Sequence, residues 1–188
     1  MTVQFMKRHI ILGSLFTPLC LALLSAVFFS ILQMQTVAAQ ATAASAKVGD
    51  HFGDWVFECA AIGEGQTLCS LTQILMAKEN NQAIARFSFS RDKKTNGIIF
   101  GALVPLGLDI QAGVSASFDQ RPPVSMTVLT CTQAGCIANA VIDPATFEAI
   151  KSGKTLAVSI KFRGADKPAV LSGSLNGLGA GAIAAGIK

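Results

Sequence analysis

Two closely spaced pairs of cysteines constrain the fold of this chain more than any other feature. Nine residues separate Cys59 from Cys69, four separate Cys131 from Cys136, and each interval contains a predicted turn. Four cysteines allow three connectivities. The sequence favours Cys59–Cys69 and Cys131–Cys136, because each bond then bridges the two facing strands of one hairpin, where the geometry is easily met.

A metal site built from the four cysteines is the alternative. Intervals of nine and four residues fit zinc signatures poorly, and neither matches the two-residue interval of a redox dithiol. We therefore expect two structural disulfides, no metal and no cofactor. Structural disulfides persist in oxidising compartments, so the same pattern predicts an exported protein.

The N-terminus carries an export signal. Lys7 and Arg8 precede an uncharged run of 23 residues, 10–32, and small residues at 37–39 or at 44–46 suit a signal peptidase, with the first site preferred. The run is also long enough to cross a bilayer, so an uncleaved membrane anchor is the alternative. Both interpretations place the rest of the chain outside the cytoplasm, in the periplasm, on the envelope or in the medium.

We divide the chain into a signal peptide or anchor at 1–39, a flexible linker at 40–47 and a folded domain at 48–188. Beyond the leader, 13 basic side chains face 11 acidic ones, a net charge of +2. Nucleic-acid binding requires a concentrated basic surface, so nucleic acid is not expected as a partner. A membrane contact is expected only through the N-terminal segment, if it is not cleaved.

Short runs that alternate apolar and polar residues fill most of the folded part. Phe87 and Phe89, for example, alternate with Arg86 and Ser88, which is the period of a half-buried strand. Strands are predicted at 54–61, 67–76, 83–90, 98–104, 108–118, 124–131, 136–142, 155–162 and 169–175. Eight or nine short strands with frequent turns indicate an all-β, immunoglobulin-like antiparallel β-sandwich.

Several local features are predicted within this sandwich. A four-residue loop at 132–135 joins two strands, and Gly107 and Gly113 mark bulges around the strand at 108–118. One short helix begins at Asp143 as N-cap. The tail, 176–188, is expected to pack on the sandwich as a short helix or a loose strand.

Few residues in the sequence are candidates for catalysis or ligand binding. His51 is the one histidine beyond the leader and would be the base of a hydrolase, but no nucleophile motif accompanies it. Trp55 is either a binding platform or, as we expect, a core residue packed beside a disulfide. Arg91, Lys93 and Lys94 form a basic hairpin tip, which is a possible contact surface for acidic glycans or lipid head groups.

Several short motifs, taken in order, resemble the invasion-associated locus B family, also called invasion protein B. They are Phe52-Gly53-Asp54-Trp55 with Cys59, Cys69 with Leu71 and Gln73, Val104-Pro105-Leu106-Gly107-Leu108 with Gly113, Cys131 with Gly135-Cys136, Gly153-Lys154, and the segment 171–178. The resemblance covers most of residues 48–180. Within these motifs we expect structural roles for Gly53, Asp54, Trp55, Pro105 and Gly107.

The resemblance implies an exported bacterial protein with an immunoglobulin-like sandwich, associated with entry into host cells. It implies no reaction and no catalytic residues. We expect a non-enzymatic envelope or secreted protein that acts by binding an unidentified protein or envelope partner, or the host-cell surface. The alternatives are a structural or chaperone-like periplasmic protein whose exposed strand edge pairs with other chains, and a hydrolase that uses His51.

Overall fold

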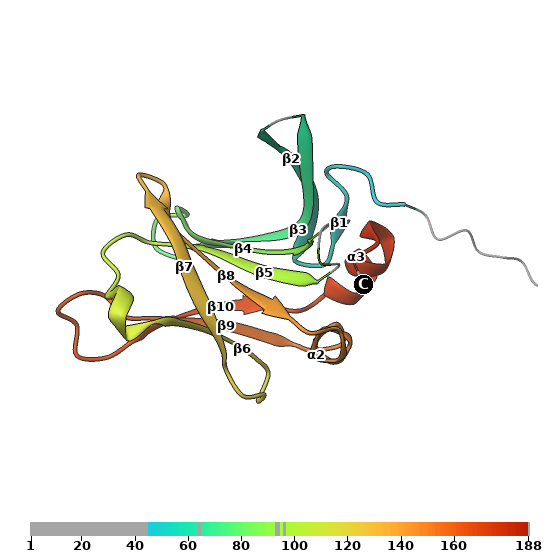
Figure 1. Ribbon diagram of the computed structural model, residues 1–188. Coiled ribbons are helices and arrows are strands. Elements are labelled where there is room, and N and C mark those ends of the chain that lie inside the picture. The colour runs from blue at the N-terminus through green and yellow to red at the C-terminus, as the bar shows by residue number, and fades with distance from the viewer. Residues whose placement is uncertain (1–44, 64, 93–94, 96, 188) are drawn as a thin grey trace, which may run out of the picture. The chain divides into compact units, whose positions relative to one another are not determined.

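The computed structural model describes residues 45–187 with the exception of residues 64, 93, 94 and 96 (Figure 1). The predicted leader, the first part of the predicted linker, Lys93 and Lys94 lie outside these residues. The elements, in order, are β1 (His51–Phe52), β2 (Trp55–Gly63), β3 (Gln66–Met76), β4 (Ala83–Arg91), β5 (Ile98–Val104), the 3₁₀ helix η1 (Ile110–Ala112), β6 (Val114–Phe118), β7 (Val124–Thr132), β8 (Gly135–Ile142), α2 (Pro144–Ile150), β9 (Thr155–Ile160), β10 (Ala169–Ser174) and α3 (Leu178–Ala185).

The ten described strands follow one order, β1-β2-β3-β4-β5-β8-β7-β6-β9-β10, and all neighbours are antiparallel. The first five strands form a meander. Strands β6, β7 and β8 are joined by consecutive hairpins, and β9 returns after α2 to lie beside β6, which is the order of a Greek key. The domain is therefore all-β, as the alternating sequence pattern predicted.

Strand β7 belongs to both layers of the sandwich. Its residues Val124–Met126 pair with β6, whereas 127–132 pair with β8. Its register with β8 shifts between Val128 and Thr130, and such a bulge bends a strand. One layer thus contains the meander β1 to β5 and strand β8. The other contains β6, β9 and β10, and the main chain of β7 joins the two layers (Figure 1).

Aromatic side chains fill the space between the two layers. Phe89 lies at the centre, with ring centroids 5.4 Å from Trp55, 5.0 Å from Phe100, 6.1 Å from Phe118 and 5.5 Å from Phe147. All five side chains are buried. Trp55 is fully enclosed, so the alternative interpretation as an exposed binding platform is wrong.

The segment predicted as one strand at 108–118 is different in the structure. It begins with an isolated β-bridge from Leu108 to Phe162, continues with the turn η1, and β6 starts only at Val114. Gly113 separates the two with φ of +77°, a conformation that is costly for other residues. The loop between β7 and β8 also differs, because it contains two residues, not four.

Helices α2 and α3 lie at the same end of the sandwich, since a side chain at Gly179 of α3 would lie 2.8 Å from the Lys151 carbonyl at the end of α2 (Figure 1). Helix α2 begins as predicted, with the Asp143 side chain accepting a 2.9 Å hydrogen bond from the Thr146 amide. The tail forms α3, and a side chain at Gly181 would lie 2.8 Å from Leu71, so this helix packs closely on β3. The amide of Ala46 donates to the Ala184 carbonyl at 2.9 Å, which ties the start of the domain to α3.

Candidate functional site

The outer face of the larger layer carries a row of large side chains in register across four strands. Ile74 on β3 lies opposite Arg86 on β4, Arg86 opposite Leu103 on β5, and Leu103 opposite Ile137 on β8. We call these four residues the outer row. Since their neighbours in sequence point into the core, the outer row faces solvent, and at the usual strand spacing it extends over roughly 14 Å.

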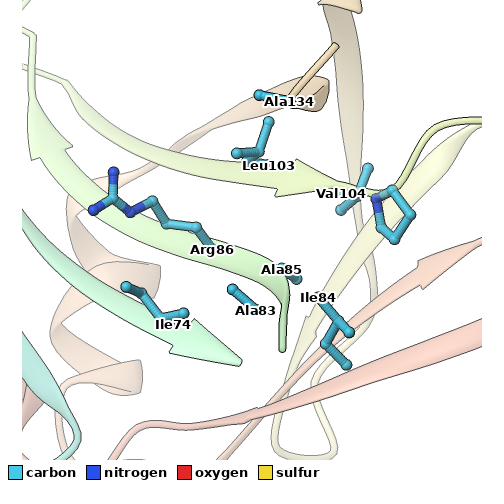
Figure 2. A pocket seen from close by; sticks show the side chains of 9 residues that line it. Ile74, Ala83, Ile84, Ala85, Arg86, Leu103, Val104 and Ala134 are labelled. Carbon is cyan, nitrogen blue, oxygen red and sulfur yellow. The ribbon is translucent and has the colours of Figure 1, made fainter. Parts of the chain in front are cut away.

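A hollow of about 480 Å³ lies beside the outer row. Figure 2 shows Ile74, Arg86 and Leu103 on three neighbouring strands, with Ala134 at the β7–β8 turn beyond Leu103. The rest of its lining is small or apolar: Ala83, Ile84, Ala85, Val104 and Pro105. The hollow is therefore an apolar depression with one cationic side chain.

The apolar side chains around the hollow are substantially exposed. Ile74 and Ile84, which line the hollow, are 47% and 38% exposed, and Ile137, the outer-row neighbour of Leu103, is 39% exposed. Single exposed apolar side chains are ordinary, but a contiguous group marks an interaction surface. The arrangement suits contact with an apolar or amphipathic partner.

Arg86 is held in place by Glu58. The guanidinium Nη2 lies 2.9 Å from Glu58 Oε2, and the two side chains are 47% and 39% exposed. An exposed ion pair of this kind stabilises the fold little. Its consequence is geometric, because it fixes one positive group beside the hollow.

The two hairpins that flank this face are each crossed by a disulfide. Cys59 pairs directly with Cys69 in the β2–β3 register, and Cys131 with Cys136 in the β7–β8 register. The pairing is the one favoured by the hairpin interpretation. Each bond restricts relative motion of the strands that border the outer face.

The residues of the Phe-Gly-Asp-Trp motif connect the beginning of the domain to its end. Gly53 has φ of +57°, and a side chain there would lie 2.6 Å from the Asn176 carbonyl oxygen. The Asp54 amide donates to that same oxygen at 3.2 Å. Gly177 is equally confined, because a side chain there would collide with the Phe52 carbonyl. Gly53 and Asp54 therefore act structurally, by contact with the segment 174–177.

Gln73 and Trp55 bind the same backbone group on β10. The Ser174 carbonyl accepts from Trp55 Nε1 at 3.1 Å and from Gln73 Nε2 at 3.1 Å, while the Ser174 amide donates to Gln73 Oε1 at 2.8 Å. The buried Gln73 amide thus imitates one residue of a neighbouring strand. Gly173 is required beside it, since a side chain there would lie 2.5 Å from Gln73 Oε1.

The structure does not bring together the residues that the sequence indicated as candidates for catalysis or binding. His51 lies exposed on β1, and within the described residues no hydrogen bond joins its side chain to a serine or a carboxylate. This position lends no support to a hydrolase. Arg91 is half-buried at the end of β4, and its Nε is buried without a hydrogen-bond partner in the described part of the chain.

Pro105 and Gly107 lie in the turn that follows β5. Pro105 lines the hollow. Gly107 has φ of +89°, and its carbonyl accepts from the Arg163 amide at 2.9 Å. The motif therefore ends β5 beside the hollow and ties the turn to the segment after β9.

One carboxylate is strongly engaged with the backbone. Asp119 Oδ1 accepts from the Thr155 amide at 2.9 Å, the Lys154 amide at 3.0 Å and the Thr155 hydroxyl at 3.1 Å. These bonds, chiefly that of the Thr155 amide, lower the pKa of Asp119 below 3.8. The group joins β6 to β9 and is not part of the hollow.

The described residues, 45–187 without the four gaps, contain no cluster of three or more potential metal ligands. They also contain no helix with the length and apolar character needed to cross a bilayer.

Sequence reasoning missed the outer row. Its signal was present: Ile74, Leu103 and Ile137 occupy outward positions of alternating strands where polar residues are usual. The alignment of these positions depends on register between strands distant in sequence, which periodicity does not supply. Gln73 was missed as a bridging residue for the same reason.

The antiparallel sandwich and its two disulfide-bonded hairpins define this chain as a small disulfide-bonded β-sandwich protein. The family model described as Invasion associated locus B (IalB) protein matches residues 55–185, and the chain belongs to that family. The match begins at Trp55 and ends with α3, so it includes the outer row, both disulfides and the contact between Trp55 and Ser174.

Named relatives agree with this assignment. Invasion protein B homologues from Brucella abortus strain 2308 and from Brucella abortus biovar 1 strain 9-941 are each 27% identical over 177 residues, covering 93% of this chain and 94% of theirs. The crystal structure of invasion associated protein B from Bartonella henselae is 23% identical, with a TM-score of 0.58, over 70% of this chain and 89% of the other. That similarity confirms the fold.

Proposed function

We propose that this chain is an exported envelope or secreted protein that acts by binding a partner through the outer row, and not by catalysis. One observation carries the proposal: Ile74, Leu103 and Ile137 align in register on a solvent-facing sheet surface, beside a hollow of about 480 Å³. A partner with an apolar or amphipathic surface, or an acidic group placed near Arg86, fits this chemistry.

Export is supported by the two disulfides, which require an oxidising compartment. It is also supported by the charged and apolar pattern of residues 1–39. Fractionation of cells into cytoplasm, periplasm, membranes and medium tests the compartment. N-terminal sequencing of the mature protein shows whether the leader is removed, and a cytoplasmic, reduced protein would contradict the proposal.

The binding surface is tested by crosslinking in living cells. A photo-reactive benzophenone amino acid at Ile137 is expected to give a discrete adduct, whereas the same group at Ile183 on α3, 66% exposed, gives none. Ile137→Glu is expected to weaken partner binding by roughly tenfold or more, since it places a charge in an apolar contact. Equal adducts at both positions, or full binding by Ile137→Glu, would contradict the assignment.

A contribution to host-cell entry follows from the names of the relatives and is part of the proposal. A deletion strain complemented with the wild-type chain is expected to enter cultured host cells better than one complemented with Ile137→Glu. Complementation with Ile183→Glu is the matched control, and His51→Ala is expected to behave as wild type. Equal entry by the deletion strain and its parent removes the role in invasion but leaves the binding surface in place.

A further inference from the structure

The last strand of the described sheet, β10, has one edge paired with β9 and one edge that receives only a side chain. Ser174 directs both its amide and its carbonyl away from β9, because both are bonded to the Gln73 side chain. The next residue, Leu175, points the other way and donates to the Lys154 carbonyl at 3.0 Å. This alternation identifies which backbone groups lie on the outer edge.

In an antiparallel strand the amide and carbonyl of one residue point to the same side, and the side alternates along the strand. Ser172 and Val170 therefore direct their amides and carbonyls to the same edge as Ser174. Their pairing with β9 is regular, without a bulge, and no backbone hydrogen bond to these four groups occurs within the described residues.

This edge lacks the usual protection against strand addition. Exposed edges are normally blocked by lysine, by proline, by a bulge or by a covering loop. The strand from Ala169 to Ser174 contains no charged residue and no proline, and its outward side chains at Val170 and Ser172 are exposed. At Val170 and Ser172 it offers donors and acceptors that no other backbone group in the described chain uses.

A groove runs along the same edge. A space of about 480 Å³ separates Ser172, Gly173 and Ser174 from the end of β3 at residues 73–76. At one end of this groove Gln73 supplies an amide that pairs with Ser174. The next inward-facing residue on β3 is Leu75, which has no polar group to offer, so the pairing that Gln73 begins stops after one residue.

We propose that the β10 edge binds an extended peptide segment of a partner protein, which continues along Ser172 and Val170 the hydrogen bonding that Gln73 starts at Ser174. Main-chain hydrogen bonds supply the affinity in this mode, and side-chain pockets supply the selectivity. Here the wall formed by Ile74, Leu75 and Met76 selects small or β-branched apolar side chains. The backbone groups of the β10 edge are not part of the outer row, although Ile74 borders both surfaces, so this inference extends beyond the proposed function.

Amide exchange measured by NMR on the intact exported protein tests the inference. The probe is a six-residue peptide of alternating threonine and valine, blocked at both ends, which matches the six residues of β10. The amides of Val170 and Ser172 are expected to exchange at least roughly tenfold more slowly when the peptide is bound. Those of Leu171 and Gly173, already paired with β9, are expected to change little.

Two controls separate backbone pairing from other contacts. The same peptide with methyl groups on alternate backbone nitrogens cannot donate to the edge and is expected to lose binding. In the protein, Ser172→Pro removes the outward amide of Ser172 without removing a bond to β9. The variant is expected to bind the peptide roughly tenfold more weakly, because it loses one hydrogen bond to the peptide. Ser172→Thr keeps the amide and is expected to bind as wild type.

The outcomes that would overturn the inference are specific. Equal binding of methylated and unmethylated peptides would show that the edge is not used, and this comparison does not depend on any variant folding. Unchanged affinity in a folded Ser172→Pro variant would show the same. Peptide-induced changes at Leu103 and Ile137 without change at Ser172 would place the peptide on the outer row, which overturns this inference and leaves the proposed function standing.

Discussion

The two layers of the sandwich are joined differently on their two sides. On one side β7 passes from one layer to the other, so the joint is a continuous main chain with ladder hydrogen bonds to both β6 and β8. On the other side β10 faces β3 across a groove, and the joint consists of the side chains of Trp55 and Gln73 on Ser174. A main-chain joint distributes its stabilisation over many residues, whereas a side-chain joint concentrates it in a few.

The largest expected effect comes from removing the indole of the side-chain joint. Trp55→Ala deletes a fully buried ring and is expected to lower the free energy of unfolding by about 3–5 kcal/mol, through lost packing and a cavity. Urea denaturation followed by circular dichroism measures it. Trp55→Phe retains most of the packing and loses only the bond to Ser174, so a loss as large as that of alanine would contradict the packing explanation.

The two disulfides allow a further comparison of the two sides of the sandwich, because one crosses the β2–β3 hairpin and the other crosses the β7–β8 hairpin. The chain-entropy model gives about 3 kcal/mol for Cys59–Cys69 and about 2 kcal/mol for Cys131–Cys136, since their sequence separations are 10 and 5. The variants Cys59→Ser with Cys69→Ser, and Cys131→Ser with Cys136→Ser, are compared in oxidising buffer by denaturation. The reverse order of stabilities would show that strain or packing, not loop length, decides.

The amide of the side-chain joint is tested by Gln73→Met, which keeps the length of the side chain and removes its polar atoms. The expected loss is about 1–3 kcal/mol, because the partly buried Ser174 amide and carbonyl are left without this partner. Amide exchange at Ser174 is expected to accelerate, while exchange at Met126 in β7 follows only the change in global stability. Equal acceleration at both amides beyond that change would erase the distinction between the joints.

The smallest effect concerns pH and the β6–β9 pairing on the main-chain side. The lowered pKa of Asp119 means that its stabilisation is complete above 3.8 and is lost as the pH falls through the lower folded value. Asp119→Asn keeps an acceptor oxygen and tolerates the φ of +52° at this position. Thermal melting from pH 7 down to pH 2 is expected to show a shallower acid decline for the variant, and parallel curves would contradict this role.

Much of this architecture could be predicted from local patterns. Alternation placed Phe87 and Phe89 in the core, hairpin-sized intervals paired the cysteines, and Asp143 with Pro144 marked the start of α2. These features depend on neighbours within a few residues, where side-chain period and capping chemistry act directly.

The remainder depended on contacts that sequence periodicity does not encode. The strand expected at 108–118 was interrupted because Gly113 adopts a positive φ that composition alone does not reveal. The outer row requires the register of four strands, and the Gln73–Ser174 contact joins residues 101 positions apart. A long-range contact of this kind becomes visible only when the order of strands is known.

The contact between Gly53 and Asn176 means that the start of the domain cannot finish folding before the segment around Asn176 has been synthesised. The indole of Trp55 and the carbonyl it binds are 119 positions apart, so a ribosome completes the first hairpin long before the chain that must enclose it exists. Until the final segment is available, the aromatic side chains near the start remain without their cover. Chains ending before Ser174 are therefore expected to be degraded or held by chaperones, and folding of the whole domain waits for the segment that contains Ser174.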